Sequence, residues 1–182
     1  RGFVKVDARM RTTAPGIWGA GDVTGGVMIA TAGAREGAVA VDDMFNPGCG
    51  CVADPLSVPM AIFTDPEVAM VGYAEEAARR AGLRVVTRTI PVTTVAKAHV
   101  TGHTRGCVKI VAEEGSGRIL GVHLASHRGA DLINEAALAV RFRLTVQDLA
   151  GTLHVYPSIG ESLRVCAQAF RRDVATLSCC AE

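Results

Sequence analysis

The last thirty residues of the chain open with LHVYPSIGE (residues 153–161) and close with LSCCAE (residues 177–182). Ser158 and Glu161 have the Ser-x-x-Glu spacing of a capping box, which predicts a helix that begins just after Ser158. Apolar residues follow at helical spacing: Ile159, Leu163, Cys166, Ala167, Phe170 and Val174. The sequence therefore predicts a Tyr-Pro turn, then a helix, and then a short polar tail.

This tail carries two adjacent cysteines, Cys179 and Cys180. Thiolates are soft ligands that bind soft metal ions, and exposed thiols also form redox pairs. From spacing alone, a metal site, a redox pair and an incidental pair all remain open. Glu161 is either a helix cap or a functional carboxylate. Tyr156 is either a site residue or a packed aromatic with a bonded hydroxyl.

Length, charge and hydropathy argue against a nucleic-acid-binding protein and against a membrane-spanning one. The chain has 182 residues and a net charge of +1 with dispersed charges, so nothing favours nucleic acid binding. No apolar stretch reaches about eighteen residues, so we expect no membrane span. The chain opens Arg1-Gly2-Phe3-Val4-Lys5, without Met or a signal peptide. We expect a fragment of a longer, cytoplasmic protein.

The cysteine spacing excludes two common kinds of site. The six cysteines are Cys49, Cys51, Cys107, Cys166, Cys179 and Cys180. None forms a Cys-x-x-Cys pair, which argues against a zinc ribbon or a thioredoxin-type site. Cys107 lies in a strand pattern and Cys166 on an apolar helical face, so we expect both to be buried. Cys49 and Cys51 form Cys-Gly-Cys in a loop, either as a site for a thiophilic metal or as an incidental pair.

The first fifty residues predict two short strands, at 3–7 and 17–22, and a helix from Met28 to about Phe45. Gly33 and Gly37 lie inside that helix, which suggests that another segment packs very close to its backbone. Gly19 to Gly25 is not a dinucleotide motif, because its last glycine is one residue too far along. Asp22 within it suits hydrogen bonds from a neutral polyol better than a pyrophosphate.

Strand and helix patterns alternate after the loop at 46–59. They predict a helix at 74–81, strands at 84–90, 107–112 and 119–125, a hairpin loop at 113–117 and a helix at 129–142. Thr145 and Asp148 form a second capping box before a short helix. Such an order is typical of an α+β layer. We expect none of the histidines to be ligands: His99, His103, His123, His127 and His154.

Three of these stretches resemble the FAD-dependent pyridine nucleotide-disulfide oxidoreductases. Residues 13–22 resemble the second flavin motif of that family, and residues 58–72 resemble the start of its dimerisation domain. The family's His-Pro-Thr turn, followed shortly by Glu, corresponds here to Tyr156-Pro157-Ser158 and Glu161. Within the family, a Tyr at this place together with a terminal Leu-Ser-Cys-Cys-Ala resembles the mercuric reductases.

The resemblance implies an α+β fold, an antiparallel sheet with helices, preceded by the C-terminal piece of an FAD-binding α/β domain. Residues 1–50 would be the remnant of the FAD-binding domain, 51–175 the dimerisation domain and 176–182 a flexible Cys-Cys tail. It also implies that Asp22, next to Gly21, binds the ribityl chain of FAD. The backbone near Ala30 would face the flavin, where the helix dipole favours negative charge.

The resemblance further implies a homodimer that reduces Hg(II) to Hg(0) with NADPH and FAD. Cys179 and Cys180 would take Hg(II) from small thiols, Tyr156 would offer a phenolic oxygen to the metal, and Glu161 would complete the site. The apolar faces at 132–140 and 159–174 would form the two-fold contact, with these residues serving the partner's flavin. The pyrophosphate site, the NADPH site and an inner cysteine pair would lie upstream. The alternatives are a reductase similar to dihydrolipoamide dehydrogenase and a non-catalytic dimerisation and metal-binding module.

Overall fold

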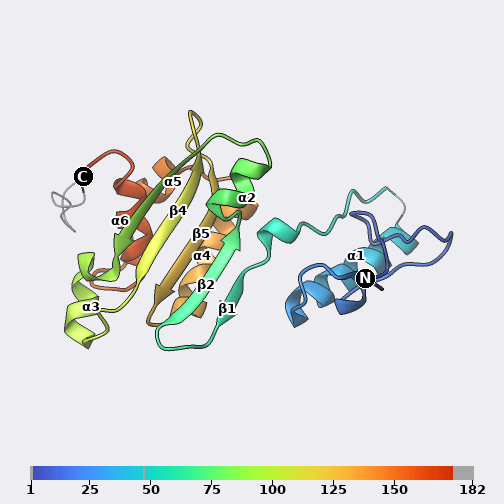
Figure 1. The fold of residues 1–182 in the computed structure, drawn as a ribbon, viewed down its shortest axis with the longest axis horizontal. Coiled ribbons are helices and arrows are strands. Elements are labelled where there is room, and N and C mark those ends of the chain that lie inside the picture. The colour runs from blue at the N-terminus through green and yellow to red at the C-terminus, as the bar shows by residue number, and fades with distance from the viewer. Residues whose placement is uncertain (1, 47, 174–182) are drawn as a thin grey trace. The chain divides into compact units, whose positions relative to one another are not determined.

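The computed structural model describes residues 2–46 and 48–173. The chain divides into two compact units, the first ending at Val58 and the second beginning at Pro59. The division falls in the loop at 46–59, eight residues after the boundary expected at 50/51. Each unit is considered by itself (Figure 1).

The first unit is built on helix α1, Ala30–Phe45, close to the helix predicted from Met28 to Phe45. Short 3-10 turns flank it, η1 at Asp22–Thr24 and η2 at Pro55–Ser57. The strands predicted at 3–7 and 17–22 are wrong. In the described part of this unit, these segments contribute only isolated bridges, Val6 to Thr12 and Arg11 to Trp18. Ile17, at the start of the second predicted strand, is 56% exposed.

The physical reason is local hydrogen bonding around Asp7. Its carboxylate accepts the backbone N–H groups of Arg9 and Arg11, both at 2.9 Å. The backbone N–H of Asp7 in turn donates to the carbonyl of Arg11 at 3.0 Å. The chain therefore folds back on itself within five residues, and its backbone groups bond in a tight turn rather than along a ladder.

The second unit contains an antiparallel sheet. In its described part, five strands follow the order β1-β2-β5-β4-β3. Their bounds are Met60–Ile62 for β1, Glu67–Gly72 for β2, Val85–Pro91 for β3, Cys107–Glu113 for β4 and Ile119–Ser126 for β5. Gly72 pairs with Gly121, and a Cβ built at Gly72 would lie 2.2 Å from the carbonyl oxygen of Leu120. These two strands therefore approach more closely than side chains would permit.

Helices cover both faces of this sheet (Figure 1). Helix α4, Gly129–Arg141, and helix α6, Glu161–Gln168, share the main apolar core with the sheet, and α5, Val146–Gly151, packs beside α6. On the other face α2, Glu75–Arg80, places Ala78 against Val85, Val111 and Leu120. Turn η3, Val92–Thr94, and helix α3, Ala96–Thr101, connect β3 to β4. The predicted α+β architecture is confirmed.

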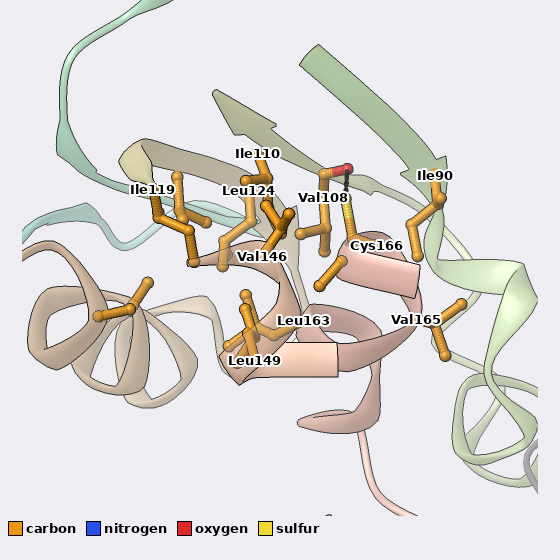
Figure 2. Packing of buried hydrophobic residues seen from close by; sticks show 14 of the residues in the cluster. Ile90, Val108, Ile110, Ile119, Leu124, Val146, Leu149, Leu163, Val165 and Cys166 are labelled. Carbon is orange, nitrogen blue, oxygen red and sulfur yellow. Dashed lines mark hydrogen bonds between the residues drawn. The ribbon is translucent and has the colours of Figure 1, made fainter. Parts of the chain in front are cut away.

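Helix α6 is held by its apolar stripe. Leu163, Cys166 and Ala167 are almost fully buried, as their spacing predicts. Figure 2 shows Cys166 pointing at the sheet, where its thiol donates to the carbonyl of Val108 at 3.4 Å. Burial raises the pKa of this thiol to about 12. The expectation of a buried Cys166 is confirmed.

Cys107 does not follow the same expectation. It is exposed at the first position of β4. Successive residues of a strand face opposite sides, and the inward side of β4 is taken by Val108, Ile110 and Ala112. Cys107 shares its parity with the partly exposed Lys109. The predicted burial is wrong because the prediction recognised the strand but did not determine which of its alternating residues face the core.

Candidate functional site

Tyr156 lies on the loop between α5 and α6. The residue is 55% exposed, so it is not a packed core aromatic. The bond from Tyr156 to Pro157 is cis. The loop returns to the core at Ile159, which is 9% exposed. The phenol therefore stands at the surface, on a segment anchored at its C-terminal end.

Glu161 is buried at 5% exposure directly after this loop. Its Oε2 accepts the backbone N–H of Ser158 at 3.1 Å, which is one half of the predicted capping box. The other half is absent, since no side chain caps α6 among the described residues and the N-cap position belongs to Gly160. The first turn is closed by backbone bonds from Ser162 to Ile159 and from Leu163 to Gly160, so the helix begins three residues after Ser158. Glu161 therefore shapes the Tyr156 loop more than it caps the helix.

His154 forms a second anchor that the sequence did not reveal. Only 9% of its side chain is exposed, and its Nε2 lies 2.8 Å from Oε1 of Glu135 on α4. Its Nδ1 lies 3.0 Å from the carbonyl oxygen of Thr152. The hydrogen bond to Glu135 raises the pKa of His154. Thus the Tyr156 loop is fixed at two points, His154 before the phenol and Glu161 after it.

In the first unit, the candidate flavin residues lie where η1 meets α1. The carboxylate of Asp22 is exposed and makes no hydrogen bond or ion pair with the described residues. The backbone N–H of Gly21 donates to Oε2 of Glu36 at 2.7 Å. Ala30, also exposed, begins α1, whose N-cap Ile29 offers no capping side chain. An acceptor carboxylate and unfilled helix N–H groups are thus presented at the surface.

The glycines of α1 divide into two cases. A Cβ built at Gly33 would lie 3.3 Å from the Cα of Gly21, which confirms the close packing predicted for this helix. At Gly37 nothing lies within 4 Å of such a Cβ, so the same prediction is wrong there. At the glycines of α1, the close approach is therefore the one between Gly33 and Gly21.

A cavity of about 560 Å³ opens in the same unit. Residues of the first segment and of α1 line it, among them Phe3, Val6, Ala32, Arg35 and Glu36. Gly21, Asp22 and Ala30 are not part of its wall. The cavity is mostly apolar, and it adjoins the candidate flavin residues, since Thr24 and Glu36 of its wall are both hydrogen-bonded to Gly21.

The cysteines are distributed over both units. Cys49 is exposed and Cys51 is partly buried, whereas Cys179 and Cys180 lie outside the described residues. A hydrogen bond with Cys49, then burial and the charges of Cys49 and Asp42, raise the pKa of Cys51 to about 11. In the described part of the chain, no three His, Cys, Asp or Glu side chains converge as a metal cage would require.

Both helical faces expected to meet a partner are packed within their own unit: on α4, Ile133 and Ala136 belong to the same apolar core as α6. Leu163 and Ala167 are buried within their own unit. On α4 and just after it, Leu138 and Phe142 are 57% and 68% exposed. Leu153 and Val155 on the Tyr156 loop are likewise exposed. The exposed apolar residues Leu138 and Phe142 therefore lie outside the expected α4 face, and further exposed apolar residues lie at Ile62, Phe63 and Val100.

None of the helices that the structure describes is both long enough and apolar enough to cross a membrane.

Comparison with known proteins places the chain in a family. Residues 58–167 match the family described as pyridine nucleotide-disulphide oxidoreductase, dimerisation domain. A mercuric reductase from Acidithiobacillus ferrooxidans is 41% identical over 181 residues, covering 100% of this chain and 33% of that protein. A dihydrolipoyl dehydrogenase from Chlorobaculum tepidum is 37% identical, covering 92% of this chain and 35% of that protein.

Solved structures of similar proteins match the fold of this chain. LpdA from Mycobacterium tuberculosis matches with a TM-score of 0.84 at 32% identity, covering 93% of this chain and 37% of that one. The HOCl-induced flavoprotein disulfide reductase RclA from Escherichia coli matches with a TM-score of 0.79 at 31% identity, covering 92% and 39%. The chain spans about a third of the length of the curated relatives it matches. It belongs to the pyridine nucleotide-disulphide oxidoreductase family, and its second unit contains that family's dimerisation domain.

Proposed function

We propose that this chain is the C-terminal part of a homodimeric flavoprotein that reduces Hg(II) to Hg(0) with NADPH. The observation that carries the proposal is Tyr156, an exposed phenol on a loop held by His154 and Glu161. It stands where the family's disulfide reductases have a histidine. Identity of about 40% to several mercuric reductases supports the same assignment.

Tyr156 suits a metal substrate better than a disulfide. A phenol has a pKa of about 10 and is a poor acid–base group near pH 7. Its oxygen can instead steady a metal ion during transfer between thiolates. Hg(II) is soft and prefers thiolates to oxygen ligands, so Cys179 and Cys180 would take the ion from small thiols and pass it on by ligand exchange.

The residues of the first unit fit part of the FAD that the family implies. The carboxylate of Asp22 is available to accept hydrogen bonds from the ribityl hydroxyls. The start of α1 at Ala30 is available to stabilise negative charge. Gly21 would only allow FAD to come close to the backbone, because its N–H already donates to Glu36 and is not available to the cofactor. FAD would supply electron transfer from NADPH. These contacts alone would hold FAD weakly, so the isolated chain should be inert and colourless.

The substitution Tyr156→Phe in the complete enzyme tests the proposal. It keeps the ring and removes the oxygen, so mercury turnover should lose about 1–3 kcal/mol of transition-state stabilisation. The unfolding midpoint should not change, and disulfide reduction should not improve. Unchanged mercury kinetics would refute the role of the phenol. Efficient reduction of lipoamide by the unaltered enzyme would instead favour a dihydrolipoyl dehydrogenase, the other activity found among the relatives.

A mixed dimer tests whether the tail serves the partner subunit. One subunit carries Cys179→Ala and Cys180→Ala, and the other lacks the inner cysteine pair. If the tail acts on the partner, one site of this dimer is complete and about half of the turnover remains. With both defects on a single subunit, each site lacks one component and turnover should collapse. The reverse pattern would show that the tail acts within its own chain.

A further inference from the structure

The loop that follows α1 places two thiols together. The backbone N–H of Cys51 donates to the sulfur of Cys49 at 3.2 Å, and the Cys51 thiol lies 3.8 Å from the carbonyl oxygen of Cys49. Gly50 between them has φ +69, a left-handed conformation that turns the chain at this point. Both sulfurs therefore belong to one tight turn. Neither forms a disulfide.

Three features suggest that the two cysteines of this turn bind a metal ion and do not serve only in packing. Cys49 is exposed and Cys51 only partly buried, so an ion carried by a small thiol can reach both sulfurs. The N–H of Cys51 donates to the sulfur of Cys49, so the turn itself holds that sulfur in place beside the second cysteine. No further His, Cys, Asp or Glu completes a cage in the described part of the chain, which disfavours tetrahedral zinc.

We propose that Cys49 and Cys51 form a two-thiolate chelate for a soft, low-coordinate metal ion such as Hg(II) or Ag(I). The proposal does not involve Cys179 and Cys180 and does not depend on the proposed mercury reduction, since it rests on this loop alone. Loading proceeds by exchange. An ion held by two small thiolates forms two bonds to the cysteine sulfurs, the two bonds to the small thiolates break, and the two cysteine protons leave on the released thiols.

A cysteine-reduced background isolates the site in the 182-residue chain. The triple substitution Cys107→Ser, Cys179→Ser and Cys180→Ser keeps Cys49 and Cys51, together with the buried Cys166. Hg(II) is titrated in excess of a small monothiol, and binding is followed by thiolate-to-metal absorption and by native mass spectrometry. We expect one ion per chain. Adding Cys49→Ser or Cys51→Ser should weaken binding by about 100-fold or more, because the chelate is lost.

Adding Cys166→Ser to the same background is the matched control, and binding should not change. Circular dichroism of each variant checks that the fold is kept, which is expected because Cys49 and Cys51 lie on a loop outside the apolar cores. Equal binding by the background and by its Cys49→Ser, Cys51→Ser variant would overturn the proposal. So would a complex in which one ion bridges two chains.

Discussion

His154 and Glu135 are joined by a hydrogen bond of 2.8 Å between Nε2 of the imidazole and Oε1 of the carboxylate. Nδ1 of the same ring faces the carbonyl oxygen of Thr152 at 3.0 Å. Both partners are acceptors, so both bonds form together only when the ring carries two protons and a positive charge. The bond to Glu135 accordingly raises the pKa of His154, although burial and the charge of Arg164 act in the opposite direction.

This relationship predicts a pH-dependent contribution to stability. A histidine whose pKa is higher in the folded than in the unfolded state stabilises the fold fully below its unfolded pKa of about 6.5, and loses that contribution as the pH rises through the folded pKa. Glu135→Gln removes the charged acceptor. The free energy of unfolding, measured in urea from pH 5 to pH 9, should fall less steeply with rising pH in this variant. NMR titration should show a lower pKa for His154.

Glu76→Gln is the control for that experiment. Glu76 carries the same charge on α2, but its side chain is 87% exposed and its only described partner is Arg80, one turn away on the same helix. Its replacement should leave the pH profile of stability as it is. The two variants giving the same profile would mean that the His154–Glu135 bond contributes nothing specific.

The glycines of α1 provide a second matched comparison. In Gly33→Ala the new methyl would meet the Cα of Gly21, which cannot withdraw easily because its N–H is bonded to Glu36 on the same helix. Gly37→Ala meets nothing and should stabilise the helix by about 1 kcal/mol. We expect Gly33→Ala to be less stable than Gly37→Ala by about 1–3 kcal/mol. Equal stabilities would show that the Gly21–Asp22 segment yields freely.

Trp18 offers a convenient signal for this measurement. It is the only tryptophan of the chain and lies in the first unit, where its indole N–H donates to Asp43 at 2.9 Å. Asp43 also accepts two bonds from Arg11, which lower the pKa of its carboxyl. Loss of these bonds changes the surroundings of the indole. Fluorescence during urea unfolding therefore reports the first unit separately from the second.

The sequence predicted the elements whose pattern is self-contained. Strands β3 to β5 follow from alternating apolar residues, and α4 follows from a stripe of helical period. The capping box at Thr145 is present in full, with the carboxylate of Asp148 accepting the Thr145 N–H. Strands β1 and β2 and helix α3, of three to six residues, were not predicted, because so few repeats establish no period by themselves. The equally short α5 was predicted from its capping box and not from a period.

The candidate site was predictable only in part, for a similar reason. The hydrogen bond that the Ser158 N–H donates to Glu161 joins residues three apart, which a local motif can reveal. His154 and Glu135 are nineteen residues apart and meet only because the loop packs against α4. No spacing rule covers such a pair. The strands predicted at 3–7 and 17–22 failed for the opposite reason. Their alternating residues give a local strand pattern, but a strand forms only where a neighbouring strand pairs with it.

The core between α6 and the sheet predicts a large effect at a single position. Leu163 is fully buried, and Leu163→Ala should lower the free energy of unfolding by about 2–5 kcal/mol through lost contacts and a residual cavity. Leu153→Ala makes the same chemical change at 80% exposure and should stay within about 0.5 kcal/mol. Urea unfolding at one fixed chain concentration compares them. Similar losses at both positions would contradict the packing described for α6.

Cys166 and Cys107 differ in reactivity for reasons visible in the fold. Burial raises the pKa of Cys166 to about 12, so at pH 8 only about one thiol in ten thousand is ionised. Its thiol is also engaged by the carbonyls of Arg88 and Val108. Cys107 is exposed at the edge of β4. Brief treatment with iodoacetamide at pH 8, followed by peptide mapping, should therefore label Cys107 and spare Cys166.

Unfolding supplies the control for this labelling. In concentrated guanidinium chloride the burial of Cys166 is lost, and both cysteines should then react at similar rates. Leu163→Ala should give an intermediate result, because a cavity beside Cys166 increases local opening. Rapid labelling of Cys166 in the native chain would mean that α6 detaches from the sheet far more often than its packing implies. The Tyr156 loop, which joins α6 directly, would then lack the fixed C-terminal anchor on which its proposed role depends.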